Sequence, residues 1–485
     1  MRDGVTRFRG SDGKTRHLVT QATAAVLAVL CCFGWGQPVQ AEPDYPAIMY
    51  VLDGIEVRGN QKTDTAFVRD LAGVEVGQTV DLAALEPVKL RLLGTGYFED
   101  VDVRLERGGE RGHVVLVVEV RERNTIILSD VFLGSSPRHP FWGGADVVEG
   151  NFLGRGLSLG AAGVVGNGQW GAEARLADPY AFNLPLRIAG TARFRDGAEP
   201  IFLRNTPQET TSGADDVPLL NYRRAGGELG GGVYPLSLLG VFLDVGYEHI
   251  EARSELPEYT SGALRDGTSH HPYLRLSLDH DTRDNPLAAT RGYRLNLQIG
   301  GSHAALGSDY DYFKAVLRTA YHKALRFGAP GHVVRFELFG GYIHGDAPFF
   351  ERFFVGDVSA LVPSRDLELN FASRPSADLF RTGAGHLAYE SVLAGGTVEY
   401  GVPIFQGRAP LYRVEFFLGA GLFGMTTPGD LPGSREASLG VRSPNDGPGP
   451  RVFPVDMTFD VGFRAETPVG VFGLSFANAL ALVPF

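Results

Sequence analysis

Apolar and polar residues alternate along most of the chain after Thr125. In 453–464, apolar residues occupy every second position, and the positions between them carry Pro, Asp, Thr, Asp, Gly and Arg. Segments 274–279, 293–300 and 412–420 show the same alternation. A period of two predicts β-strands with one apolar and one polar face. Since no long segment here has the spacing of an amphipathic helix, we expect one large all-β domain.

Fifteen or sixteen segments of this kind can be counted, and closure of a single-chain antiparallel barrel requires an even number, sixteen. The candidate strands lie near residues 125–133, 143–150, 157–166, 169–177, 186–195, 221–234, 239–251, 271–280, 291–302, 310–325, 332–345, 386–402, 411–424, 453–466, 469–477 and 479–485. An irregular segment at 346–385, rich in Pro, Arg and Asp, interrupts the series.

The polar faces of these strands carry full charges, such as Arg275, Asp279 and Glu415. A soluble barrel of this size would enclose a large volume that needs apolar filling. An outer-membrane barrel has the opposite arrangement, with apolar residues toward lipid and polar residues toward the lumen, and fits better. A soluble β-sandwich or propeller is the alternative.

The segment before the barrel has a mixed pattern. Strands are predicted at 48–58, 98–105 and 113–120, and helices at 63–73 and 81–93, which gives the order β-α-α-β-β. Thr63 or Asp64 is the expected N-cap of the first helix. Pro87 should kink the second helix or delay its start.

The N-terminus has the layout of a secretory signal peptide. Arg and Lys residues precede the apolar stretch 22–36, and Val39-Gln40-Ala41 follows as a cleavage signature. We therefore predict a signal peptide at 1–41, with an uncleaved anchor helix as the alternative. Both cysteines of the chain, Cys31 and Cys32, fall within it, so the mature protein is expected to contain none.

Composition excludes several classes of function. The net charge of −11 argues against a nucleic-acid binder, which should carry a basic face. The 64 glycines among 485 residues fit tight turns and crowded positions inside a barrel. No Gly-x-Ser-x-Gly elbow and no metal-ligand spacing is present in the sequence, so we expect no enzymatic activity, no cofactor and no bound metal.

The N-terminal module resembles a POTRA domain, a periplasmic polypeptide-transport module. The resemblance rests on GIEVRGN at 54–60 and GTGYFEDVDVRL at 94–105, and it covers residues 46–122. It implies an exposed sheet-edge strand that can pair with an incoming peptide strand. The residues assigned to that edge are Phe98, Val101, Val103 and Leu105. A small α/β domain with no binding role is the alternative.

The remaining chain resembles the outer-membrane barrel-assembly superfamily typified by BamA and TamA. Two turn motifs carry the resemblance, NFLGRG at 151–156 and DTRDNPLAATRGYRL at 281–295, and a terminal Phe485 adds to it. The motif residues are Asn151, Phe152, Gly154, Asp281, Arg283, Asp284, Gly292 and Tyr293. The resemblance implies an N-terminal α/β POTRA domain followed by a 16-stranded antiparallel transmembrane β-barrel at 125–485.

In this superfamily a long loop after the eleventh strand tucks an Arg-Gly-aromatic motif into the lumen. The loop is present at 349–371, but the tripeptide is not. Arg365 is the nearest candidate for the inserted arginine, and its aromatic follower is absent.

The seam between the first and last barrel strands is the expected working part. It would join Ile126, Leu128 and Leu133 to the short final strand that holds Pro484 and Phe485. Because proline cannot donate to a strand ladder, we expect a weak seam that opens laterally and accepts substrate strands. An ordinary closed barrel, with the last strand misplaced in our reading, is the alternative.

The resemblance implies an outer-membrane protein assembly or insertion factor whose N-terminal domain lies in the periplasm. Expected partners are outer-membrane lipid, unfolded outer-membrane or secreted polypeptides, and periplasmic or lipoprotein partners, but not nucleic acid. Two other functions stay open: a polypeptide secretion pore of the two-partner-secretion type, and a plain solute channel.

Overall fold

The computed structural model describes residues 48–477 with gaps, and residues 478–485 lie outside it. The gaps are 136–139, 185, 201–218, 237, 254–263, 286–287, 326–330, 357–366, 373–378, 381, 383, 385–388, 409 and 429–453. The predicted signal peptide at 1–41 and the predicted strand at 479–485 lie outside the described residues.

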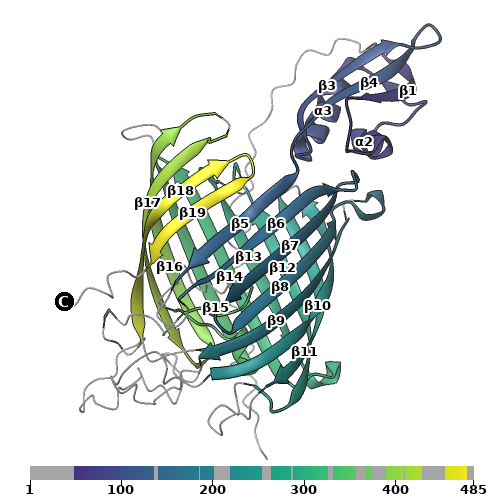
Figure 1. Cartoon of the computed structure of the whole chain (residues 1–485). Helices are drawn as coiled ribbons and strands as arrows, with labels where there is room; N and C mark the ends of the chain where they lie inside the picture. The colour runs from purple at the N-terminus through teal and green to yellow at the C-terminus, as the bar shows by residue number, and fades with distance from the viewer. Residues whose placement is uncertain are drawn as a thin grey trace, which may run out of the picture. The chain divides into compact units, whose positions relative to one another are not determined.

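The N-terminal domain is a small sheet covered by helices (Figure 1). Its elements are β1 (Tyr50–Arg58), α2 (Thr65–Ala72), β2 (Thr79–Val80), the 3₁₀ turn η1 (Leu82–Ala84), α3 (Leu85–Gly94), β3 (Phe98–Arg107) and β4 (His113–Glu122). The sheet has the order β2-β1-β4-β3, with β1 parallel to β4 and the other pairs antiparallel. Leu52, Val68, Leu92 and Val118 are fully buried in its core.

Local chemistry sets the helix boundaries. Of the two predicted caps, Asp64 is the N-cap of α2, and its side chain accepts a hydrogen bond from the Ala66 amide at 2.7 Å. Gly73 ends the helix with a left-handed φ of 63°. The 3₁₀ turn precedes α3, which begins only at Leu85, so Pro87 lies in its first turn, where proline is tolerated. No helix among the described residues is long and apolar enough to cross a membrane.

The rest of the described chain forms one continuous antiparallel meander of fifteen strands (Figure 1). The strands are β5 (Ile126–Gly134), β6 (Trp142–Phe152), β7 (Leu157–Gly166), β8 (Gln169–Asp178), β9 (Leu186–Pro200), β10 (Leu219–Leu236), β11 (Leu239–Ala252), β12 (Thr268–Asp281), β13 (Gly292–Ser302), β14 (Asp311–Ala324), β15 (Val333–Asp346), β16 (Val392–Gln406), β17 (Arg413–Thr426), β18 (Val455–Thr467) and β19 (Gly470–Ala477). They match the first fifteen predicted strands, so the period of two identified this domain.

The barrel has two ends, which we name from the chain direction. The proximal end is where β5 begins, and it holds the turns at 151–156 and 281–292. The distal end is where β5 finishes, and it holds the connection between β15 and β16 at 347–391. Each strand pairs only with its sequence neighbours in this sheet, so successive connections alternate between the two ends.

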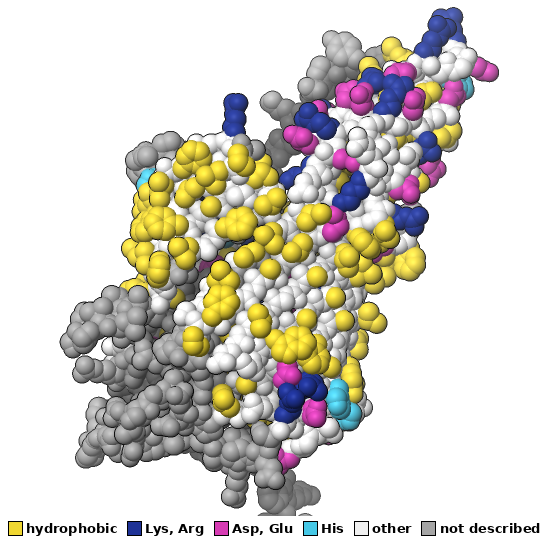
Figure 2. Space-filling model, viewed as in Figure 1, with side chains coloured by type: hydrophobic (Ala, Val, Ile, Leu, Met, Phe, Trp, Pro, Cys, Tyr) yellow, Lys and Arg dark blue, Asp and Glu magenta, His cyan; other side chains and the backbone are white. Residues whose placement is uncertain are grey.

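The outward face of the barrel is apolar and the inward face is polar. Leu338 in the middle of β15 is 63% exposed, and Leu274 and Leu276 on β12 are also exposed. Figure 2 shows apolar side chains spread over the strand surfaces. On the inward face, Glu415 and Asp456 are buried. This is the predicted arrangement of a lipid-facing barrel, in which lipid replaces water around the apolar side chains.

A charge on the outward face should therefore destabilise the barrel. Replacing Leu338 by Arg places a guanidinium near mid-strand, and we expect a loss of about 2–4 kcal/mol in the free energy of unfolding. The measurement is urea unfolding of the barrel in lipid vesicles. Gln298→Arg is the matched control because Gln298 lines the interior, and its expected effect is within about 0.5 kcal/mol. Equal losses in both variants would contradict the assigned orientation.

An ion pair in the N-terminal domain makes its stability depend on pH. His113 Nδ1 lies 2.5 Å from Asp53 Oδ1, and this hydrogen bond raises the pKa of His113 above 6.5 and lowers the pKa of Asp53 below 3.8. The histidine contribution is complete below pH 6.5 and is lost as the pH rises through the raised pKa. The aspartate contribution is present above pH 3.8 and is lost as the pH falls through the lowered pKa. We expect maximal stability between these limits.

The test is chemical unfolding of the domain, residues 46–122, across this pH range. Asp53→Asn should flatten the profile because it removes the charged partner of His113. Glu99→Gln is the control, since Glu99 and its partner Arg121 are both largely exposed to solvent. A profile for Asp53→Asn that runs parallel to that of the native domain would show that the pair does not set the dependence.

Candidate functional site

The two ends of the meander meet with very little pairing. In the described residues, one backbone hydrogen bond joins them, from the Leu128 amide to the Val469 carbonyl at 2.7 Å. The strands β19 and β5 lie side by side in Figure 1. Gly470 fits this contact closely, because a Cβ on it would come within 2.1 Å of the Leu128 carbonyl oxygen. Every other neighbouring pair forms a ladder along much of its length.

Strand number explains the sparse pairing. Fourteen antiparallel steps separate β5 from β19, so these two strands run in the same direction. Direct closure of the described sheet would need a parallel ladder instead of the antiparallel one used elsewhere. The sequence prediction placed the seam between Ile126, Leu128, Leu133 and a final strand with Pro484 and Phe485, and those last two residues lie outside the described part of the chain. Among the described residues, the neighbour of Leu128 across the seam is Val469.

The connection between β15 and β16 enters the lumen. Its buried residues form the largest apolar cluster of the barrel together with residues of the wall. The first arm of this lumen segment, 349–355, contributes Phe349, Phe350, Phe353, Phe354 and Val355, and the second arm, 367–372, contributes Leu369, Phe371 and Ala372. The sequence pattern had marked 346–385 as irregular, since its aromatic residues have no strand or helix period.

The first arm is held by β14 and by the returning chain. Lys314 Nζ donates to the carboxylate and the carbonyl of Glu351 at 2.8 and 2.7 Å. Phe353 and Glu390 exchange two backbone hydrogen bonds of 2.8 Å. These contacts fix the arm within the distal half of the lumen.

The second arm is held by the strands that follow β5. Gln169 Nε2 donates to the Asn370 carbonyl at 2.8 Å, and Phe371 stacks on Trp142 of β6 with ring centroids 4.9 Å apart. Arg195 on β9 donates to the Leu367 carbonyl. Arg365, the sequence candidate for the inserted arginine, lies outside the described residues. The sequence analysis missed Glu368 of the second arm and the wall residues Arg193, Arg195 and Arg224 that bind it. Only the charge of these side chains could have signalled them.

Returning residues of the same connection reach the opposite side of the seam. Thr382 Oγ1 donates to the Val455 carbonyl at 2.6 Å, and Phe380 contacts Asp456 through its amide at 3.4 Å. Both partners lie at the distal start of β18, which neighbours β19.

Networks of opposite charges line the wall. Glu228 on β10 binds Arg193 at 3.1 Å and also binds Arg275 of β12. A second network joins Arg335 and Glu399 at 2.8 Å on β15 and β16, and continues through Arg464. Such pairing lets charged side chains occupy a barrel interior without isolated charges.

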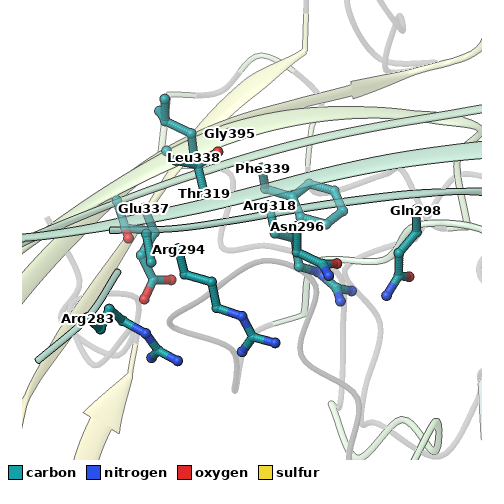
Figure 3. A pocket seen from close by; sticks show the side chains of 13 residues that line it. Arg283, Arg294, Asn296, Gln298, Arg318, Thr319, Glu337, Leu338, Phe339 and Gly395 are labelled. Atoms are coloured by element: carbon teal, nitrogen blue, oxygen red, sulfur yellow. The ribbon is translucent and has the colours of Figure 1, made fainter. Parts of the chain in front are cut away.

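A hollow of about 370 Å³ lies along β13 to β16 and reaches the proximal turn at Arg283. In Figure 3, Arg294, Arg318 and Glu337 extend from the same side of their strands into it. Eight of its thirteen lining residues are polar or charged, which fits a lumen that holds water.

The motif at 281–295 stabilises a proximal turn. Arg283 binds Asp281 through two nitrogens, at 2.9 and 2.7 Å. Asp284 accepts hydrogen bonds from the amides of Thr290 and Arg291. Burial alone would raise the pKa of Asp284, but these bonds outweigh it and lower the pKa. Gly292 has a φ of 97° and a Cβ there would lie 2.4 Å from the Thr282 carbonyl, so only glycine fits. The Thr282 amide donates a hydrogen bond of 2.8 Å to the Tyr293 carbonyl, which closes the turn.

The motif at 151–156 binds the start of α2. The buried Asn151 donates to Thr63 Oγ1 at 2.9 Å and accepts from the Gly156 amide at 2.8 Å. The Gly154 carbonyl accepts from the Asp64 amide at 2.9 Å. Gly154 has a φ of 68°, and a Cβ would lie 2.0 Å from the Lys62 carbonyl oxygen, so the glycine allows this close approach. Phe152 ends β6 at this turn.

The strand predicted to bind substrate in the N-terminal domain is β3. It lies at one end of the described sheet and pairs with β4. Phe98 and Val101 point into the domain core, whereas Val103 and Leu105 are half-buried. No group of three or more metal-ligating side chains occurs among the described residues.

Comparison with known families identifies both domains. Residues 50–123 match the POTRA family described as surface antigen variable number repeat, and residues 151–361 match the Omp85 superfamily domain. The chain is also similar to the outer membrane protein assembly factor BamA of Nitratidesulfovibrio vulgaris, with 25% identity over 379 residues. That alignment covers 76% of this chain and 43% of the relative, so the chain spans less than half the length of that protein.

A solved structure, that of a BamA, shows the same fold. BamA from Haemophilus ducreyi lacking POTRA domains 1–3 superposes with a TM-score of 0.57 at 17% identity, covering 88% of this chain and 80% of that chain. CdiB from Escherichia coli superposes with a TM-score of 0.47 at 11% identity, covering 95% and 94%. The domain matches and the architecture together give the chain a POTRA domain followed by a large antiparallel β-barrel that carries the Omp85 superfamily domain.

Proposed function

We propose that this protein assembles or inserts other β-barrel proteins in the outer membrane by pairing with their unfolded strands and opening its own seam. The similarity to an outer membrane protein assembly factor supports this proposal. The observation that carries the proposal is the seam, where in the described chain one hydrogen bond joins Leu128 of β5 to Val469 in the turn just before β19.

Unpaired strand edges in lipid favour the exchange. Backbone N–H and C=O groups without partners are costly in hydrocarbon, so an incoming strand that pairs with them lowers the free energy. A closed ladder would offer no such groups. The seam of β5 and β19 is therefore the part of the barrel that can accept a strand with the least loss of native pairing.

The POTRA domain offers a second edge for a polypeptide on the periplasmic side. β3 is ten residues long and its only partner among the described strands is β4. A strand from an unfolded substrate can extend this sheet through main-chain hydrogen bonds, which do not depend on its sequence. Binding of a substrate strand at β3 therefore requires no ligand pocket in the POTRA domain.

A polypeptide secretion pore of the two-partner-secretion type is the second candidate. It needs a continuous passage along the lumen, and the hollow beside β13 to β16 provides part of one. The lumen segment fills the distal half with aromatic side chains such as Phe349 and Phe354, which favours the seam as the working route.

A disulfide across the seam tests the mechanism. Cysteines replacing Leu128 and Val469 lie on residues whose backbone N and O atoms are 2.7 Å apart, so oxidation should lock β5 to β19. We expect the oxidised protein in lipid vesicles to lose insertion of a radiolabelled unfolded barrel substrate, and reduction to restore it.

The control places the same bond inside a complete ladder. Leu128 and Val147 are partners across β5 and β6, so cysteines there should leave insertion unchanged. Full activity of the oxidised seam variant would refute lateral opening. Transfer of substrate into the vesicle interior, without membrane insertion, would instead support the secretion pore.

Deletion of residues 46–122 tests the contribution of the POTRA domain. We expect other barrels to reach the outer membrane in reduced amounts, because the edge strand β3 is lost with the domain. Membrane fractionation and heat-modifiable gel mobility of the substrate barrels provide the measurement. Unchanged assembly would favour a plain solute channel, for which the domain has no use.

A further inference from the structure

Three arginines of the barrel wall converge on one carboxylate of the lumen segment. Guanidinium nitrogens of Arg224 on β10 and of Arg193 and Arg195 on β9 lie 3.0, 3.7 and 3.9 Å from the carboxylate of Glu368. The side chains of Arg195 and Arg224 are each only 2% exposed. Charged groups buried this deeply require oppositely charged partners at short distance.

Arg224 holds both arms of the lumen segment. Its guanidinium carbon lies 3.7 Å from the ring centroid of Phe350 on the first arm, while one of its nitrogens binds Glu368 on the second arm. A planar guanidinium can bind a carboxylate in its plane and an aromatic ring on its face at the same time. One wall residue thus connects two segments that are separated by residues 357–366.

The three arginines have partners in the wall as well. Glu173 lies 3.2 Å from Arg195, Glu228 lies 3.1 Å from Arg193, and Glu248 lies 2.6 Å from Arg224. These carboxylates position the guanidiniums but do not saturate them, because each guanidinium has five N–H donors. Nη2 of Arg224 donates both to Glu248 of the wall, at 2.6 Å, and to Glu368, at 3.0 Å.

The backbone at this contact is strained. Leu367 and Glu368 have φ values of 46° and 67°, in the left-handed region that residues with a Cβ disfavour. Such a conformation persists only where the surroundings hold it. Here the contacts that hold it are the hydrogen bond from Arg195 to the Leu367 carbonyl and the ion pairs of Glu368.

We propose that Arg193, Arg195 and Arg224 form a carboxylate-binding site in the barrel wall whose ligand is Glu368 of the chain's own lumen segment. Glu368 is a positioning residue: its binding keeps the aromatic residues of the segment across the distal half of the lumen and closes the pore. The charge arrangement is the reverse of the one expected for Arg365, since the loop supplies the anion and the wall supplies the cations. The proposal is independent of which polypeptides the barrel handles.

Single-channel recordings of the full-length protein in planar bilayers test the site. Glu368→Gln keeps the shape of the side chain but removes its charge, so we expect the fraction of time spent open to rise about tenfold. Glu368→Asp retains a carboxylate and should recover part of the closure.

Raising KCl from about 0.1 M to about 1 M should open the native channel, because Glu368 is 42% exposed and salt screens its ion pairs. The same change should have little effect on Glu368→Gln, which lacks the charge.

Two further variants keep the outcome interpretable. Glu251→Gln removes the same charge near the distal end of β11, where Glu251 lies 3.9 Å from Arg223, and should behave as native. Arg224→Lys keeps a cation beside Glu248 but loses the planar fork, and in the Glu368→Gln background it should add less opening than it does alone, because only its contact with Phe350 is then left to lose. Heat-modifiable mobility on gels verifies that each variant is folded. Native closure in Glu368→Gln, equal opening in Glu368→Asp and Glu368→Gln, or additive effects with Arg224→Lys would each overturn the proposal.

Discussion

Backbone hydrogen bonding in a medium without water is the constraint on which this architecture depends. Each strand that crosses the hydrocarbon has to pair its N–H and C=O groups with protein, because lipid offers no partners. The described barrel meets this requirement through consecutive antiparallel ladders from β5 to β19. The seam is the exception, and the function that we propose places substrate strands there because the same constraint makes an unpaired edge bind them.

The alternation of side chains follows from the same constraint. A strand in lipid has to present apolar residues outward, so the inward face is free to carry charge, and Glu415 and Arg335 occupy it. A lumen lined by charges can hold water, ions or a protein segment that matches them. The lumen segment matches the wall in two ways, with aromatic residues that pack together and with Glu351 and Glu368, which bind cations on β14, β9 and β10.

The sequence predicted the elements well and the long-range contacts poorly. A period of two located all fifteen described strands of the barrel, because this pattern depends only on residues close together in the chain. The N-cap at Asp64 and the glycine turns were predictable for the same reason. The ion pair between Arg224 and Glu368 joins residues 144 positions apart, and nothing in the local pattern of either segment indicates it. Arg365 was selected by analogy with the superfamily motif, while the contact that the structure describes uses a neighbour of opposite charge.

The lumen segment relates the two proposals, because it touches both sides of the seam. Phe371 stacks on Trp142 of β6, beside β5, whereas Thr382 hydrogen-bonds to Val455 of β18, beside β19. Separation of β5 from β19 at the distal end moves these two attachment points apart. On the side of β9 and β10 the segment is held by ion pairs of Glu368 with three arginines. At β18 the described contacts are the neutral hydrogen bonds between Thr382 and Val455 and a longer contact, 3.4 Å, from the Phe380 amide to Asp456, and these are individually weaker. Lateral opening therefore favours release of the segment from β18, with Glu368 still bound, so that strand exchange at the seam does not require the pore to open.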